Sequence, residues 1–187
     1  MRLFIAFPLD QTVKDKLAAV IDDLKPACDA VKWVARQNIH LTSRFLGETH
    51  ENQIPKIIEK LDYIAAKYRP FESVIDTIGA FPNPRRPRII WVGTTRNVDF
   101  LTKIATHVEL AMQSIGFEAE TKRFKAHLTL GRVKDPRRLD DLPDCLDSYR
   151  FEPIPLSFDR LVLFKSTLQR TGPIYDRLHE AMLAPKE

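Results

Sequence analysis

The chain has few cysteines and no long apolar run, and both shortages limit what it can be. Cys28 and Cys145 are the only cysteines among 187 residues, which argues against the disulfide framework that holds small secreted domains together. No stretch approaches the ~20 apolar residues that a membrane-spanning helix needs. The apolar run over 3–7 is too short for a secretory signal and stops at Pro8. We therefore expect a cytoplasmic protein with reduced thiols and no membrane contact.

The chain also lacks low-complexity segments and a strong charge imbalance. Its hydrophobic fraction of 44% is ordinary for a globular protein, and its length suits one domain or two small lobes that share a core. The net charge of +4 is compatible with a polyanionic ligand but does not require one. Composition alone therefore predicts a folded protein and leaves its ligand open.

The apolar patterns predict interleaved helices and strands. One helix is capped by Asp10 and ended by Pro26, and two more cover about 51–68 and 97–114. Several strands follow one another directly, which favours an α+β fold with antiparallel sheets. The predicted strands cover 2–7, 31–34, 39–46, 71–81, 89–92, 124–133, 156–165 and 174–182.

One tetrapeptide occurs twice within a longer internal repeat. His40-Leu41-Thr42-Ser43 returns as His127-Leu128-Thr129-Leu130, and an apolar strand precedes each copy. The first copy follows Arg2 by 38 residues and the second follows Arg88 by 39. We infer a repeat with a period near 87, over about 2–47 and 88–133, inside a single two-lobed domain spanning 1–187.

Alternation along a strand puts the His and Thr of each motif on one face. His40 and Thr42 share a face, and Leu41 and Ser43 share the other. The second motif repeats this arrangement with His127 and Thr129. The same parity predicts cations on that face, from Arg44 and Lys125. If the halves pack about a pseudo-two-fold axis, two imidazoles and two hydroxyls converge between cations.

That set of groups suits hydrolysis of a phosphodiester. A pKa of ~6.5 allows one imidazole to accept a proton from water while the other donates one to the leaving alkoxide. Threonine hydroxyls and cations can hold the non-bridging oxygens. The sequence therefore predicts His40 and His127 as catalytic residues, with Thr42, Thr129, Arg44 and Lys125 binding the substrate.

A metal site and a purely structural role are the alternatives for these histidines. Each motif strand offers one histidine, without a carboxylate two residues on, so the ligand inventory argues against a metal. We expect no cofactor. A lone His-x-Thr on a strand is more often a polar patch, but repetition at matched positions favours chemistry. His50, His107 and His179 lack threonine at that spacing, and we interpret them as surface or capping residues.

The paired motifs resemble the signature of the 2H phosphoesterases. The sequence that flanks them resembles the RNA 2′,3′-cyclic phosphodiesterase branch of that superfamily, also called 2′–5′ RNA ligase-like. The resemblance covers nearly the whole chain. It rests on these matching stretches, two of which contain the motifs: 2–6, 38–48, 87–93, 126–133 and 163–166, with Tyr175 downstream.

The resemblance implies a fold and a set of roles. The fold is two pseudo-two-fold-related lobes, each an antiparallel sheet with outer helices, around a central cleft. His40 is the implied proton donor and His127 the acceptor, with Thr42 and Thr129 on the phosphate. Arg132 is implied to contact phosphate too, although strand parity points it away unless a bulge intervenes. Ser43 departs from the family, which has an apolar residue there.

The implied reaction is metal-independent hydrolysis of RNA 2′,3′-cyclic phosphate ends, such as those of tRNA halves, to 2′-phosphates, together with 2′–5′ joining of RNA ends. Two other hypotheses remain: a non-catalytic nucleotide- or RNA-binding module, and a phosphodiesterase for a small nucleotide such as an ADP-ribose cyclic phosphate. We expect a monomer, because one chain completes the site.

A basic turn and two aromatic residues bear on substrate size. Arg85, Arg86 and Arg88 lie in a proline-rich turn over 82–88, which favours a longer polyanion; a merely solvated loop is the alternative. Trp33 and Phe45 could stack a base, but core packing is the stronger expectation for both.

Overall fold

A computed structural model of the chain describes residues 1–170 and 172–184, in which the strands form one large and one small antiparallel sheet. The large sheet has the order β10-β9-β1-β3-β7-β6-β5, with β2 also paired to β7, and the small sheet pairs β4 with β8. Apart from β10 and β2, the order is symmetric about the β3–β7 seam, with β9, β1 and β3 on one side and β7, β6 and β5 on the other. The strands are β1 (Arg2–Phe7), β2 (Val31–Trp33), β3 (Leu41–Glu48), β4 (Phe71–Ile75), β5 (Thr77–Phe81), β6 (Ile89–Gly93), β7 (His127–Val133), β8 (Ile154–Phe158), β9 (Arg160–Gln169) and β10 (Gly172–Met182).

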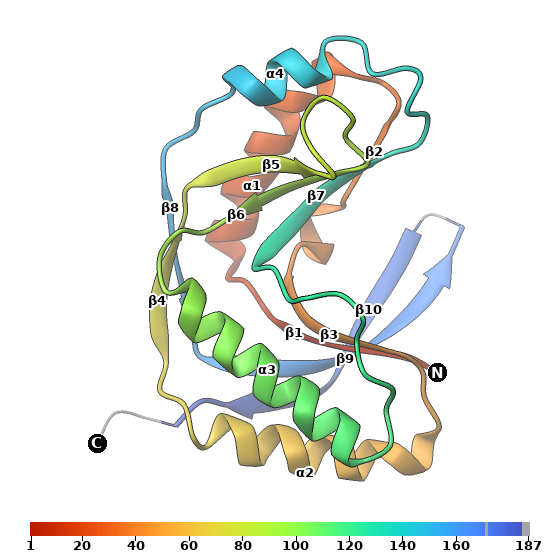
Figure 1. Cartoon of the computed structure of the whole chain (residues 1–187), viewed down its shortest axis with the longest axis vertical. Helices are drawn as coiled ribbons and strands as arrows, with labels where there is room; N and C mark the ends of the chain where they lie inside the picture. The colour runs from red at the N-terminus through yellow and green to blue at the C-terminus, as the bar shows by residue number, and fades with distance from the viewer. Residues whose placement is uncertain (171, 185–187) are drawn as a thin grey trace.

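Helices cover the outer face of each half of the sheet, which confirms the predicted α+β fold with two lobes. In Figure 1, α2 and α3 lie beneath the first lobe, formed by β10, β9, β1 and β3. The second lobe, formed by β2, β7, β6 and β5, is backed by α1 and α4. The α-helices are α1 (Gln11–Leu24), α2 (Ile54–Ala65), α3 (Val98–Ser114) and α4 (Leu142–Ser148). None of them is long and apolar enough to cross a membrane, within the residues that the structure describes.

The apolar face of each helix packs on the sheet to form one main core. Ile57 and Leu61 of α2 are fully buried, as are Leu101 and Val108 of α3, at the spacing of one helical face. A separate buried cluster lies on the opposite face of the first lobe and contains Phe4, Ala6, Val162 and Phe164. We call this opposite face, which also carries the motif residues, the motif face.

Four local predictions were wrong. The segment 156–165 is two strands rather than one, because β8 and β9 pair in different sheets. The segment 71–81 is two strands rather than one, because β4 and β5 pair in different sheets. The break is at Asp76, whose carboxylate accepts hydrogen bonds from the backbone N–H (3.0 Å) and hydroxyl (2.5 Å) of Thr95. No helix was predicted between 133 and 156, where the structure has α4. The motif strands also begin later than predicted, with His40 just before β3 and His127 as the first residue of β7.

Candidate active site

The two motifs meet at the seam between the lobes. Leu41 of β3 pairs with Leu128 of β7, and this is the one ladder pair that joins the two strands in the described structure. Continuing the antiparallel register from this pair sets Thr42 across from His127 and His40 across from Thr129. Each histidine therefore lies opposite the threonine of the other motif.

The two imidazoles are held in the same way. His40 Nδ1 lies 2.7 Å from the carbonyl oxygen of Asn38, and His127 Nδ1 lies 2.7 Å from that of Lys125. A carbonyl oxygen only accepts hydrogen bonds, so Nδ1 carries the proton in both rings. The Nε2 atoms are therefore the ones that can exchange a proton with a substrate.

A β-bulge interrupts both strands at the last residue of the motif. In β3, Ala6 pairs with Thr42 and Ile5 with Arg44, so Ser43 is the extra residue. In β7, Trp91 pairs with Thr129 and Ile90 with Gly131, so Leu130 is the extra residue. Each bulge reverses the alternation beyond it.

The bulge in β3 makes the prediction for Arg44 wrong. Arg44 pairs with Ile5, which lies in the main core, and its side chain therefore points toward the helices rather than the motif face. The residue is 8% exposed. Strand parity assumed unbroken alternation, and the extra residue at Ser43 removes that assumption.

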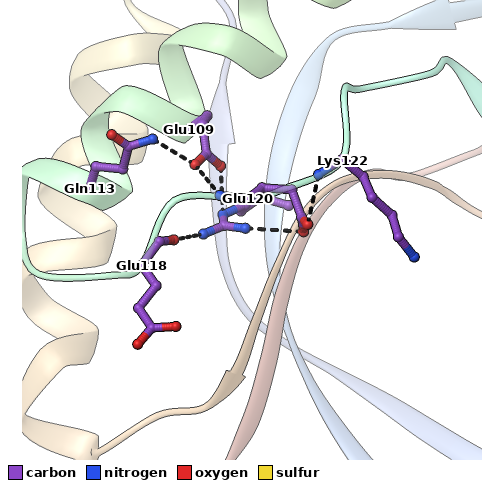
Figure 2. Close-up of polar contacts among 6 residues, drawn as sticks. Glu109, Gln113, Glu118, Glu120 and Lys122 are labelled. Atoms are coloured by element: carbon purple, nitrogen blue, oxygen red, sulfur yellow. Dashed lines mark hydrogen bonds and ion pairs between the residues drawn. The ribbon is translucent and has the colours of Figure 1, made fainter.

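Arg44 is instead the centre of the polar cluster in Figure 2. Its Nε lies 2.8 Å from a carboxylate oxygen of Glu109 on α3, as an ion pair whose N–H is not aimed at that oxygen. The two terminal nitrogens donate to the Glu118 carbonyl and to the Glu120 carboxylate, the latter at 3.2 Å. Glu109 also accepts from Gln113 and from the Glu120 backbone N–H, both at 2.8 Å. Arg44 thus ties the first motif strand to the segment that leads into the second motif.

The bulge in β7 has the opposite consequence for Arg132. Arg132 pairs with Ile89, and Ile89 also pairs with Phe81, whose ring contacts His127 at 5.1 Å between centroids. Paired residues share a face, so Arg132 lies on the motif face. Lys125 lies there too, with its Nζ 5.0 Å from the centroid of the Phe81 ring. Both cations lie close enough to lower the pKa of His127.

The surroundings of the two histidines differ. His40 packs against Phe4 and Tyr175, with ring centroids 4.9 and 5.3 Å away. Burial lowers the pKa of His40 to about 4, and the cation of Lys14 and the charge of His127 act in the same direction. Burial also lowers the pKa of His127, to which Arg132 and Lys125 add. Both rings are therefore neutral at pH 7 in the free protein.

The remaining groups at the seam are hydroxyls and cations. Thr42 and Thr129 are half-buried, and neither hydroxyl is hydrogen-bonded to another residue within 1–170 and 172–184. No group of three or more His, Cys, Asp or Glu side chains in the described part of the chain is arranged to hold a metal ion.

Sequence reasoning missed Lys14 and the role of Tyr175. Lys14 of α1, Arg177 of β10 and Tyr175 line a cavity of about 100 Å³ beside His40. The Lys14 ammonium donates to the Gln37 carbonyl at 2.9 Å. No local pattern marks Lys14, because only the packing of α1 brings it to the first motif.

Four other residues considered in the sequence analysis, two histidines and two aromatic residues, lie in different surroundings. His107 bonds to the Tyr68 hydroxyl at 2.6 Å and His179 to Asp62 at 2.6 Å, both away from the seam. Trp33 packs against Gly131, where an added Cβ would lie 2.9 Å from the indole, so its core packing is confirmed. Core packing was also expected for Phe45, and this prediction was wrong. Phe45 is 59% exposed and pairs with Phe4 on the motif face, because it follows the bulge at Ser43.

Comparison with known proteins gives one consistent family. The family model of LigT-like phosphoesterases matches residues 7–91 and again 92–175. The chain is 35% identical to an Archaeoglobus fulgidus RNA 2′,3′-cyclic phosphodiesterase over 95% of this chain and 98% of that protein. It is also 35% identical to the enzyme of that name from Thermotoga maritima, over 96% of this chain and 94% of that protein.

Solved structures agree on the fold. A Thermus thermophilus protein matches over 100% of both chains with a TM-score of 0.82 and 25% identity. Escherichia coli LigT, solved with ATP, matches over 98% of both chains with a TM-score of 0.73 and 21% identity. The family resemblance inferred from the two motifs is confirmed, and the chain belongs to the LigT-like phosphoesterases of the 2H superfamily.

Proposed function

We propose that the chain hydrolyses the 2′,3′-cyclic phosphate end of RNA to a 2′-phosphate without a metal ion. The observation that carries this proposal is the pair of imidazoles with identical tautomers, each facing the threonine of the other motif across the seam. The names of the curated relatives support the substrate class. Under this proposal the substrate is RNA with a cyclic phosphate end, such as a tRNA half. The enzyme acts as a monomer in the cytoplasm.

The reaction needs one proton accepted and one donated. His127 Nε2 takes a proton from water as the water oxygen bonds to phosphorus, and the bond from phosphorus to the ribose 3′-oxygen breaks. His40 Nε2–H protonates that oxygen, which leaves a 2′-phosphate and a free 3′-hydroxyl. If an RNA 5′-hydroxyl attacks phosphorus in place of water, the same steps join two ends through a 2′–5′ linkage: His127 takes the hydroxyl proton, the bond from phosphorus to the 3′-oxygen breaks, and His40 protonates that oxygen.

The donor role of His40 requires the substrate. With its pKa lowered by burial, His40 is neutral in the free protein at pH 7. A phosphate monoanion between the rings favours the imidazolium form and raises both pKa values. The bound diester thus brings the single proton onto the pair of histidines.

Three groups stabilise the added charge on phosphorus. The Thr42 and Thr129 hydroxyls donate to the non-bridging oxygens, and Arg132 supplies a cation on the motif face. Replacing both threonines by valine removes two hydrogen bonds to a charged oxygen, each worth on the order of 1.5–3 kcal/mol. Full activity of the double variant would show that these hydroxyls do not contact the phosphate.

The direct test is to incubate the protein with a short RNA that ends in a 2′,3′-cyclic phosphate, with EDTA present. We expect a single 2′-phosphate product, identified by phosphorus NMR and by resistance to a 3′-specific phosphatase. A 3′-phosphate would reverse the assignment of the leaving oxygen. Activity lost with EDTA and restored by one divalent ion would overturn the metal-free mechanism. Turnover of an ADP-ribose cyclic phosphate but not RNA would favour the small-nucleotide hypothesis, and binding without turnover would favour a recognition module.

A further inference from the structure

Positive charge is concentrated in two segments that contain the strands β5, β6 and β7 of the second lobe. The segments 77–98 and 121–134, which include β5, β6 and β7, contain nine lysines and arginines and no acidic residue. Those nine leave 20 of the 29 basic residues to face all 25 acidic residues in the rest of the chain. The small net charge of +4 therefore hides two strongly cationic segments.

The cations of these two segments form no ion pair within the described residues. Some arginines elsewhere are paired, as Arg44 is with Glu109 and Arg160 with Asp159. Unpaired, exposed guanidinium groups are available to a polyanion.

The turn between β5 and β6 presents three of these arginines on an ordered backbone. The Asn83 side-chain oxygen accepts the backbone N–H groups of Arg85 (3.1 Å) and Arg86 (3.0 Å). The backbone N–H of Arg88 closes the turn by donating to the Phe81 carbonyl at 2.8 Å. All three arginine residues are exposed, and none of their guanidinium groups bonds to a described residue. A turn held by its own backbone bonds loses little further freedom when a ligand binds.

The turn is continuous with the candidate active site. Phe81, the last residue before it, contacts the His127 ring, and Lys125 lies over the Phe81 ring. At the other end of the turn, the Arg88 carbonyl accepts the Val133 N–H at 3.0 Å, next to Arg132. Arg85 is four residues from Phe81, a reach of at most ~14 Å, which a few nucleotides of single-stranded RNA cover.

We propose that the β5–β6 turn binds the backbone phosphates of the nucleotides that precede the cyclic end, so that the enzyme prefers an RNA chain to a mononucleotide. This inference rests on the proposed function, whose site lies at the near end of the turn. Backbone phosphates attract cations without regard to base, so the turn confers a preference for RNA length rather than for sequence.

The test compares a triple variant, Arg85→Gln, Arg86→Gln and Arg88→Gln, with wild type on two substrates. The substrates are adenosine 2′,3′-cyclic phosphate and a ten-nucleotide RNA with the same cyclic end. We expect kcat/KM for the RNA to fall on the order of tenfold at low salt, and kcat/KM for the mononucleotide to stay within about twofold. The matched control is Lys56→Gln, Lys60→Gln and Arg69→Gln, which removes the same charge around α2 at the far end of the molecule (Figure 1).

A binding measurement separates failure of this inference from failure of the proposed function. Fluorescence anisotropy with a ten-nucleotide RNA ending in a 3′-phosphate needs no turnover. We expect the slope of log Kd against log salt to fall by about 2 in the turn variant, since each single-strand phosphate contact contributes ~0.7. Equal losses on both substrates, an equal loss in the α2 control, or an unchanged salt slope would each overturn the proposal. An acidic protein as the partner of the turn would leave both RNA measurements unchanged. Wild-type protein that binds RNA with the expected slope but hydrolyses neither substrate would overturn the proposed function alone.

Discussion

The motif strands β3 and β7 share two backbone features at their motifs, whereas the side chains around them differ. Each strand holds its histidine by a carbonyl two residues earlier and has a bulge at the fourth motif residue. His40 lies among aromatic rings and is the more deeply buried, whereas His127 lies beside Lys125 and Arg132. Two strands with a shared local backbone arrangement can thus hold their histidines in matched positions while the surroundings of the two rings differ.

The largest expected effect is the loss of either histidine. His40→Ala and His127→Ala should each lower kcat by ~10²–10⁴-fold, because one group donates a proton and the other accepts one in the same reaction. Single-turnover rates on the cyclic-ended RNA measure this, with exposed His50→Ala as the control. If one variant keeps a near-native rate, the histidine that was replaced in it takes no part in the reaction. The two motif strands would then be equivalent in backbone arrangement but not in function.

The next effect separates the two arginines that follow the motifs. Arg132→Gln should lower kcat/KM about tenfold without changing the melting temperature, because the side chain is exposed on the motif face. Arg44→Gln should cost about 1–3 kcal/mol of unfolding free energy, because it leaves Glu109 and Glu120 without their partner. Denaturant titration together with steady-state kinetics distinguishes the two. An unchanged stability of Arg44→Gln would contradict the structural role of the cluster in Figure 2.

A smaller effect is a displacement between two pH profiles. Burial lowers the pKa of both histidines in the free protein, that of His40 to about 4. The reactive form of the enzyme carries one proton on the two histidines together. The pH profile of kcat/KM reports the free enzyme, so its fall on the basic side should lie below pH 6.5. The bound anion raises both pKa values, so the kcat profile should lie at higher pH. Superimposable profiles would show that the substrate does not change the titration, and a single sigmoid would mean that one histidine suffices.

The smallest effect concerns the bulge residues themselves. Ser43 stands where β7 has Leu130, and its buried hydroxyl has no partner among the described residues. Ser43→Ala removes an unsatisfied polar group, and we expect it to raise the unfolding free energy by up to ~1 kcal/mol with no change in kcat. Thermal denaturation checks this, and Ser148→Ala, whose hydroxyl bonds to backbone carbonyls of α4, serves as the comparison. A destabilised Ser43→Ala variant would mean that the hydroxyl is satisfied by water.

Much of the fold followed from local patterns. The helices α1 and α3 lie within a residue or two of their predicted ends, because apolar residues at helical spacing and terminating residues act locally. The split of 71–81 was missed because it depends on which distant strands β4 and β5 pair with. For the site, the motifs indicated the two histidines and two threonines, whose chemical roles stay predictions, as does the division into repeats over 2–47 and 88–133. Lys14 carried no local signal.

The sequence by itself determined the class of site: two His-x-Thr strands at matched places in a repeat, with the residue types that phosphodiester chemistry requires. Only the tertiary structure decided which cations accompany them. Alternation with a period of two predicts a face only while the ladder is unbroken, and a bulge is set by how neighbouring strands pair, which a single strand does not record. The extra residue at the fourth motif position of each strand therefore sends Arg44 into an ion-pair cluster under the sheet and brings Arg132 to the motif face.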